Sequence, residues 1–353
     1  MVDTLLTTPL SPWQDGSGNM ADIVLDSRVR LVRNLKQYVF PCKASAAELA
    51  AVAAEGKKMT GQLNAIGKGV YEYTDLMELT PLQRELLVVK HFSSAAHIRE
   101  PANRGILLRN DGAVSVMVNE DDHFCIQTAA AGLDLQKVWQ EAAQVDDTME
   151  SHLNFAFRDD FGYLTASPSM TGTGLITGVT LHLPALVLMK RLNRIVQGIT
   201  KFGFTICGMY GERNECIGNV FQVTNQITLG VSEVDVLDQL EKIVTQIVTE
   251  ERNCRSALLT HSRDSFTDKF LRSYGILANA WLMEEREAIS LLSDLRMAAD
   301  MNIAHVRPLA YEALMTASEA AFLQARAGRE LSDDERQHQR AQVLQEVLAA
   351  YAR

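Results

Sequence analysis

Alternation of apolar and polar residues divides the first part of the chain into short extended segments. Because successive side chains of a strand point to opposite faces, this period of two indicates a sheet. The Asn110-Asp-Gly112 sequence between two such segments is typical of a hairpin turn. The pattern predicts strands over Asp22–Leu35, Gly105–Leu108, Ala113–Val118, Phe124–Gln127, Val179–Leu183, Phe204–Tyr210 and Phe221–Leu229.

Apolar residues spaced three and four apart predict helices between these strands. Ser45-Ala-Ala-Glu48 is a capping box that opens one of them, and Pro184 suits the first turn of another. Helices are expected over Ser45–Leu63, Pro81–Lys90, Leu135–Phe157, Ala185–Gln197 and Ser232–Arg252. Since hairpins join many of the strands, we expect an α+β fold with an antiparallel sheet flanked by helices, rather than a doubly wound sheet.

Beyond about Leu258 the pattern is helical only. Helices are expected over Phe266–Glu287, Ala288–Met297 and Pro308–Ala327, with Gly328 as a stop signal. Ser332-Asp-Asp-Glu335 is a second capping box, which opens a last helix to Tyr351. The chain is therefore expected to have two domains, an α+β domain over 1–257 and an all-α C-terminal domain over 258–353.

Composition narrows the class of protein. A chain of 353 residues with 47% hydrophobic content can bury a sizeable core, and its net charge of -10 argues against bulk binding of nucleic acid or anionic membranes. The five cysteines are scattered without a C-x-x-C pair, and no metal-ligand motif such as H-E-x-x-H occurs. No window approaches the roughly 20 apolar residues of a membrane span. We expect a cytoplasmic protein with reduced thiols and no residues assigned to a metal.

Three segments carry candidate chemistry. Arg28 and Arg30 share one face of an extended segment and would repel each other unless an anion or a carboxylate lies between them, or else the segment is a solvated strand edge. Glu120-Asp-Asp122 is either an acidic turn or a site for a metal or cationic substrate. The glycine-rich loop within Gly162–Leu186 offers backbone N–H groups to an anion, or is a tight structural connection. The residues alone leave each of these alternatives open.

The order of the motifs resembles the ATP:guanidino phosphotransferases. The motifs are DIVLDSRVRLVRN (Asp22 to Asn34), MVNEDDHFCIQ (Met117 to Gln127), GYLTASPSMTGTG (Gly162 to Gly174), YGERNECIGNVFQVTNQITLG (Tyr210 to Gly230) and RSYGIL (Arg272 to Leu277). The resemblance spans nearly the whole chain, and the helical tail favours the bacterial protein-arginine kinase branch. It implies transfer of the γ-phosphoryl group of ATP, with Mg²⁺, to arginine side chains of proteins.

The resemblance also assigns nucleotide-binding positions. Phosphoryl transfer depends on positioning and charge neutralisation, so the phosphates require guanidinium groups and Mg²⁺. Matching positions are Ser27, Arg28, Arg30, His91, Cys125, Ile176 and Cys207. The family has arginine where this chain has Cys125, Ile176 and Cys207. Arg213, beside Glu212, is a candidate replacement.

On the substrate side, the resemblance assigns Asp121, Glu212 and Ser167 as catalytic residues. Asp121 is one methylene shorter than the family glutamate, and a displacement of about 1 Å at a catalytic group can cost on the order of 10²-fold. Ser167 replaces a cysteine and does not ionise near neutral pH as a thiol can. In the tail, Arg336, Gln337 and Arg340 match a phosphoarginine-binding motif in which Gln337 replaces an aspartate, although a solvated helix face is equally compatible with the pattern.

These departures favour a homologue of protein-arginine kinase with weak or lost activity that acts by binding. The alternative is an active protein-arginine kinase with a rearranged ATP-phosphate site. The resemblance further implies protein substrates or phosphoarginine proteins as partners, a zinc-containing activator protein, Clp unfoldases and a homodimer. ATP and Mg²⁺ are the expected cofactors of an active enzyme.

Overall fold

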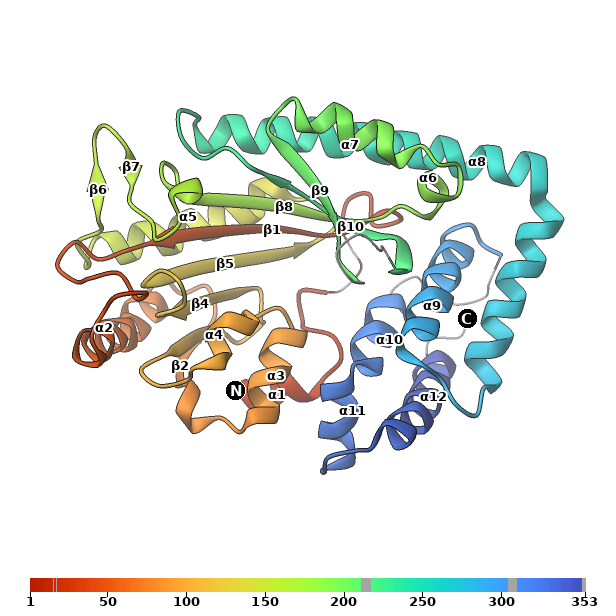
Figure 1. Ribbon diagram of the computed structural model, residues 1–353, viewed down its shortest axis with the longest axis horizontal. Coiled ribbons are helices and arrows are strands. Elements are labelled where there is room, and N and C mark those ends of the chain that lie inside the picture. Colours follow the sequence, from red (N-terminus) through yellow and green to blue (C-terminus); the bar gives the residue numbers. More distant parts are fainter. Residues whose placement is uncertain (15, 17, 211–216, 304–309, 351–353) are drawn as a thin grey trace.

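The computed structural model describes residues 1–14, 16, 18–210, 217–303 and 310–350. Within these residues the centre is an eight-stranded sheet of order β2-β3-β4-β5-β1-β8-β10-β9 (Figure 1). All neighbouring strands pair antiparallel, which confirms the predicted sheet type. The strands are β1 (Val24–Arg33), β2 (Tyr71–Asp75), β3 (Gly105–Arg109), β4 (Val114–Val118), β5 (Phe124–Ala131), β8 (Leu175–His182), β9 (Phe204–Gly208) and β10 (Val220–Asn225).

Three helices cover one face of this sheet. They are α2 (Ala46–Ala65), α5 (Leu135–Glu150) and α8 (Glu233–Asn279), which pack on the strands in a common apolar core. The predicted capping box is present at α2, where the Ser45 side chain accepts from the Glu48 N–H and the Glu48 side chain accepts from the Ser45 N–H. The sequence signal for this helix therefore coincides with its observed start.

Short helices cover part of the opposite face. These are α1 (Val2–Thr7), α3 (Pro81–Val89), α4 (Ala95–Arg99) and α11 (Ala320–Ala327). A second apolar cluster joins them to β3 and β4, with Leu5, Leu86, Ile106, Met117 and Phe322 among its members. The region of the same face formed by β1, β8 and β10 instead lines cavities, which makes it the candidate functional surface.

Two of the predicted helices form one continuous helix, and another predicted helix is divided into two shorter ones. Helix α8 runs on between Arg252 and Phe266, where the sequence has no glycine or proline to end it, and it bends at Ser262 (φ -148, ψ 34). The helix expected over Ala185–Gln197 is two helices, α6 (Pro184–Leu188) and α7 (Leu192–Thr200). Lys190 takes a left-handed φ of 56, which ends α6.

The remaining predicted elements occur in the predicted order with shifted bounds, whereas β2, α1 and α4 were not predicted. Helix α5 ends at Glu150, before a small hairpin of β6 (Phe157–Arg158) and β7 (Gly162–Tyr163). The C-terminal helices are α9 (Glu285–Asp300), α10 (Ala310–Ser318), α11 and α12 (Asp333–Ala350), with 3-10 turns at Leu76–Glu78, Pro168–Met170 and Ile217–Asn219. An extended Glu319 separates α10 from α11, so the helix expected there is interrupted. None of the helices in the described ranges is long and apolar enough to cross a membrane.

A buried ion pair fixes β1 to α5. The Arg33 side chain is 2% exposed, and its guanidinium donates to both carboxylate oxygens of Asp146, with the shortest contact at 2.6 Å. It also donates to the carbonyls of Val32 and Thr173, and it lies 3.6 Å from the ring centroid of Tyr163. One side chain therefore ties together the central strand, a helix and the glycine-rich loop.

We predict that Arg33→Ala lowers the free energy of unfolding by about 3–5 kcal/mol, because Asp146 would be left buried without a counter-charge. The matched control is Arg158→Ala, which breaks the exposed Arg158–Asp160 pair (57% and 54% exposed) and should cost less than about 1 kcal/mol. Urea unfolding curves of the two variants and the parent chain measure both values. Equal losses in the two variants would contradict the structural role of Arg33.

Candidate functional site

The sheet register brings the predicted nucleotide positions onto one face. Residues that pair directly on neighbouring antiparallel strands point to the same side of the sheet. Arg30 pairs with Ile176 on β8, and Val32, two residues further along β1, pairs with Cys125 on β5. Cys207 on β9 pairs with Gln222 on β10, which in turn pairs with Thr180 on β8. Arg28, Arg30, Cys125, Ile176 and Cys207 therefore share a surface, which we call the arginine face.

Ser27 lies on the opposite side of β1. Its side chain is fully buried, and its hydroxyl donates to the Gly132 carbonyl at 2.7 Å and accepts from the Asp134 N–H at 3.1 Å. In this structure Ser27 fastens β1 to the connection between β5 and α5. The structure does not bring its side chain to the arginine face.

Each arginine of the arginine face already has a carboxylate partner. Arg28 makes a two-pronged contact with Asp26, with Nε to Oδ1 at 2.9 Å and Nη2 to Oδ2 at 3.2 Å. Burial opposes ionisation of Asp26, but the Arg28 guanidinium outweighs it and holds the pKa of this carboxyl below its usual value. Arg30 pairs with Glu120 and also contacts the Cys125 sulfur. The sequence left open what separates the two arginines, and the structure shows one carboxylate for each.

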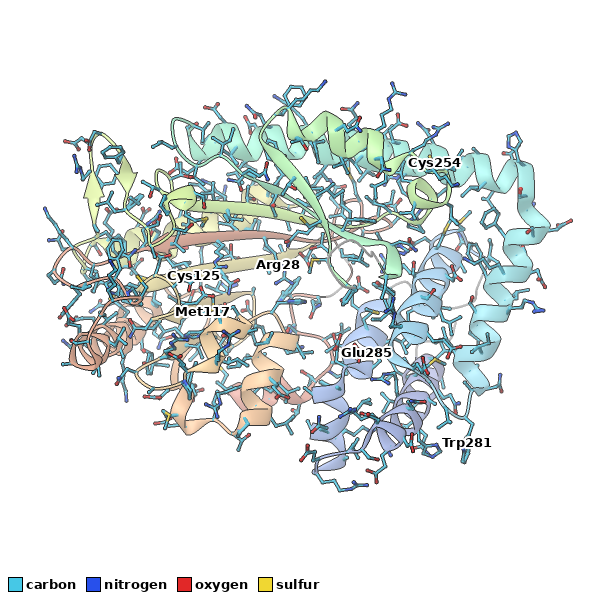
Figure 2. The ribbon with its side chains drawn as sticks, viewed as in Figure 1. Arg28, Met117, Cys125, Cys254, Trp281 and Glu285 are labelled. Atoms are coloured by element: carbon cyan, nitrogen blue, oxygen red, sulfur yellow. The ribbon has the colours of Figure 1, made fainter. Side chains whose placement is uncertain are left out.

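The positions where the family has arginine carry no positive charge here. Cys125 is fully buried in the apolar cluster beneath α3 and α4, and burial raises the pKa of its thiol to about 12. Ile176 is half-buried and Cys207 is exposed on the same face. Figure 2 labels Arg28 on β1 and Cys125 on β5, near the middle of the sheet. A polyphosphate on this face would meet two arginines that are already neutralised.

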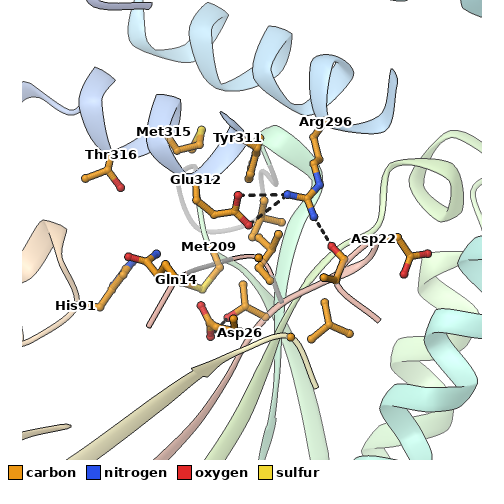
Figure 3. Close-up of a pocket in the computed structure, with 18 of the residues that line it drawn as sticks. Gln14, Asp22, Asp26, His91, Met209, Arg296, Tyr311, Glu312, Met315 and Thr316 are labelled. Carbon is orange, nitrogen blue, oxygen red and sulfur yellow. Dashed lines mark hydrogen bonds and ion pairs between the residues drawn. The ribbon is translucent and has the colours of Figure 1, made fainter. Parts of the chain in front are cut away.

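Cavities adjoin the arginine face. One of about 590 Å³ opens between β1 and the C-terminal helices, and another of about 190 Å³ lies over β1, β8 and β10. Arg28, His91, Lys90 and Trp13 line both. Figure 3 shows the larger cavity with Asp26 and His91 on one side and Arg296 bound to Glu312 on the other.

The groups beside Arg28 add little free positive charge. The His91 ring lines both cavities, where desolvation and the Arg28 guanidinium both lower the pKa of its imidazole. Burial lowers the pKa of Lys90 to about 8. Its ammonium donates to the carbonyls of Thr8 and Pro9 at 3.0 Å each. These bonds hold the segment between α1 and β1, which we call the N-terminal arm. The Trp13 ring of that arm lies 5.8 Å from the Arg28 guanidinium carbon.

The acidic turn and the loop with Ser167 lie next to each other. Asp122 is buried and accepts from the Ala166 N–H at 2.6 Å and from the Asn34 amide at 2.5 Å. Burial raises the pKa of the Asp122 carboxyl, and these two hydrogen bonds partly offset that shift. Asp121 is exposed, as is Ser167, whose hydroxyl contacts that of Ser169 at 2.8 Å. Asp122 is thus a structural link, while Asp121 and Ser167 are accessible to a ligand.

The glycine-rich loop is a structural connection. The N–H of Gly172 donates to the Tyr163 carbonyl at 3.2 Å, and that of Thr173 donates to the Thr228 carbonyl at 2.9 Å. A Cβ atom at Gly172 would lie 2.1 Å from the Thr228 oxygen, so the close approach requires glycine. The N–H groups of Gly172 and Thr173 are therefore bonded within the chain. These two groups do not support the alternative that the loop binds an anion.

The two arginines of the tail motif face different partners. Arg340 is buried and donates to the carbonyls of Ser318 at 2.9 Å and Met283 at 3.1 Å. Arg336 is half-buried and pairs with Asp333, and Gln337 is also half-buried on α12. In this arrangement the two guanidinium groups do not converge on one anion. The phosphoarginine-binding role of Arg336, Gln337 and Arg340 stays a prediction.

Two predicted site residues lie outside the described residues. The structure also shows two carboxylate partners of the arginines that the sequence analysis did not identify as such. Glu212 and Arg213 fall in the segment that the structure leaves undescribed. Asp26 was not assigned to the site from the sequence, and Glu120 was named only as part of the acidic turn, not as the partner of Arg30. Asp26 had a signal, because it precedes Arg28 by two residues and so shares its face. Within the described ranges, no cluster of three or more His, Cys, Asp or Glu side chains is arranged to hold a metal ion.

Comparison with known proteins places these observations in a family. The model of the ATP:guanido phosphotransferase C-terminal catalytic domain matches residues 55–254, and that of the protein-arginine kinase McsB C-terminal domain matches residues 263–353. A protein-arginine kinase of Brevibacillus brevis is 39% identical over 97% of this chain and 96% of its own length. One of Shouchella clausii is 39% identical over 98% of this chain and 97% of its own.

Solved structures show the same fold. Lombricine kinase superposes with a TM-score of 0.60 at 22% identity, covering 69% of each chain. The duplicated taurocyamine kinase from Schistosoma mansoni superposes with a TM-score of 0.59 at 24% identity, covering 69% of this chain and 35% of its own. The α+β arrangement predicted from the sequence is thus confirmed.

We predict that Cys125 resists alkylation in the folded protein at pH 8, while Cys42 and Cys207 react, because the latter two are exposed and Cys125 is a buried thiol with a raised pKa. Mass spectrometry of peptides after a short iodoacetamide treatment gives the extent of labelling at each site. The urea-unfolded chain is the control and should be labelled at all three. If Cys125 of the native protein were labelled as fast as Cys207, its thiol would be accessible to solvent, contrary to its burial in the structure.

Proposed function

The chain belongs to the ATP:guanido phosphotransferase family, among relatives named protein-arginine kinases, and we propose that it is a homologue with weak or lost kinase activity that acts by binding. The observation that carries the proposal is the neutralised arginine face. Arg28 and Arg30 are the arginines that this face offers in the described strands, and both are paired with carboxylates of the chain itself.

The energetic argument concerns the ATP phosphates. Their negative charge must be neutralised by guanidinium groups and Mg²⁺ placed before the reaction begins. If each missing arginine removed a charge-assisted hydrogen bond of about 1.5–3 kcal/mol, three such losses would sum to roughly 5–9 kcal/mol, with additivity incomplete. A bound phosphate must in addition compete with Asp26 and Glu120 for the two arginines that remain. The residues present therefore fit a triphosphate poorly.

The guanidinium side of the site is better preserved. Asp121 and Ser167 are exposed in adjacent loops, held together by the Asp122 carboxylate. A carboxylate and a hydroxyl can accept hydrogen bonds from an arginine side chain without any proton transfer. The shorter Asp121 and the non-ionising Ser167 weaken the case for catalysis more than the case for binding. We therefore propose arginine-bearing segments of other proteins as the ligands of this site.

The alternative is an active protein-arginine kinase whose phosphate site is rebuilt from Arg28, Arg30 and Arg213. Lys90 is a further cation beside Arg28, but its ammonium is held by two backbone carbonyls of the N-terminal arm. Under this alternative, ATP and Mg²⁺ are the cofactors, and Arg213→Ala abolishes turnover. Unchanged turnover in that variant would remove the proposed compensation.

We predict that the full-length protein shows no micromolar binding of Mg·ATP by calorimetry and forms no phosphoarginine on a protein substrate. The physical reason is the shortage of free positive charge on the arginine face. Phosphoarginine is assayed by mass spectrometry under conditions that preserve the acid-labile P–N bond, with Glu212→Ala as the control for background. Micromolar binding, together with phosphoarginine that disappears in Glu212→Ala, would overturn the proposal in favour of the active kinase.

We further predict that Ile176→Arg combined with Cys207→Arg tightens Mg·ATP binding by about tenfold or more, since each new guanidinium can add a charge-assisted hydrogen bond. Both positions are accessible, whereas an arginine at the buried Cys125 should destabilise the apolar cluster instead. The matched control, Ile176→Gln with Cys207→Gln, is polar but uncharged and should leave the affinity low. Equal affinities of the arginine and glutamine variants would refute the charge argument.

A further inference from the structure

The segment that carries α6 and α7 is basic in an acidic protein. Residues 161–210 contain no aspartate or glutamate, while the whole chain has a net charge of -10. Lys190, Arg191, Arg194 and Lys201 fall within this segment, and all four are exposed along or beside α7. These cations are not required by the arginine face, since none of them lines the cavities there.

An apolar groove runs beside this basic edge. It lies between α7 and the first half of α8, which run side by side in Figure 1, and it encloses about 550 Å³. Its apolar lining includes Ile195 and Phe202 on the α7 side and Ile243 on the α8 side. Phe202 is 68% exposed, a large fraction for an aromatic side chain.

One residue of the groove lining is a glycine, which has no side chain to fill the groove. A Cβ atom added at Gly198, in the last turn of α7, would meet no atom within 4 Å. Glycine inside a helix costs roughly 0.5–1 kcal/mol relative to alanine, and it permits another chain to come close to the backbone. The missing side chain therefore leaves open space between the apolar residues and the basic edge.

We propose that this groove docks an amphipathic helical segment of a partner protein that carries an acidic edge. Apolar side chains of the segment would cover Ile195, Phe202 and Ile243, and its carboxylates would lie along Lys190, Arg191, Arg194 and Lys201. Helix-in-groove binding uses this combination of an apolar stripe and a charged edge. The four cations are the reason for assigning an acidic edge to the partner.

The other edge of the groove argues against a flat anionic surface. Glu250 of α8 lines the groove and lies 4.0 Å from Arg191. Asp238 and Glu241, with Lys242 beside them, lie further along the same helix. A membrane or nucleic acid broad enough to reach all four cations would also approach these carboxylates, in a protein of net charge -10. A second copy of this acidic chain is likewise disfavoured by charge. A narrow helix can instead place its carboxylates toward α7 alone.

The test uses the full-length protein and a synthetic helical peptide with a leucine face and a glutamate edge, followed by fluorescence anisotropy. The expected result is saturable binding that weakens with salt, and at least about tenfold weaker binding after Arg191→Glu with Arg194→Glu. The same charge reversal should improve binding of a peptide in which lysine replaces glutamate. Equal binding of the two peptides to the parent chain would overturn the proposal.

A second pair of variants tests the groove rather than the charge. Gly198→Phe should fill the groove and abolish peptide binding, while Gly61→Phe is the matched control, because Gly61 is also a helix glycine with nothing within 4 Å of an added Cβ. Circular dichroism spectra of both variants should match that of the parent chain, which would show that they are folded. Peptide binding that survives Gly198→Phe would exclude the groove. Binding of phosphatidylserine vesicles or duplex DNA at the affinity of the acidic peptide would replace the proposal by a general anionic surface.

Discussion

The antiparallel register of β1 between β5 and β8 determines where Asp26, Arg28 and Arg30 point. Side chains of β1 alternate between the helix-covered core and the arginine face, so Val29 and Leu31 are buried while Arg28 and Arg30 face the cavities. A shift by one residue would exchange the two sets. The buried Arg33–Asp146 pair resists such a shift, because it locks the end of β1 to α5.

The same register places the neutral side chains that make the site unusual. It puts Ile176 beside Arg30 and brings Cys125 close enough for its sulfur to contact the Arg30 guanidinium. Asp26 and Glu120 supply the counter-charges that a phosphate would otherwise supply. Both arginines of the face are thus paired with carboxylates without a nucleotide. This pairing is the physical basis for proposing a binding role over phosphoryl transfer.

The two binding sites that we propose lie on separate surfaces of the molecule. The exposed Asp121 and Ser167 lie at loops beside the arginine face, whereas the groove of Ile195 and Phe202 lies over α7 and α8, and α8 covers the opposite side of the sheet. Occupation of one therefore does not obstruct the other. A protein of this design can hold an arginine-bearing segment and a helical partner together.

Local patterns determined much of this molecule from the sequence alone. Period-two alternation located seven of the eight strands that the structure describes in the sheet and missed β2. The capping boxes at Ser45 and Ser332 marked true helix starts, and the ordered motifs identified the family. Each of these signals depends on residues that are neighbours in the chain. Tertiary structure decided what depends on distant partners: the pairing of Arg30 with Glu120, the inward turn of Arg340, and the continuity of α8 past Arg252. The energy of such contacts comes from burial and charge across the fold, and no local spacing in the sequence records it.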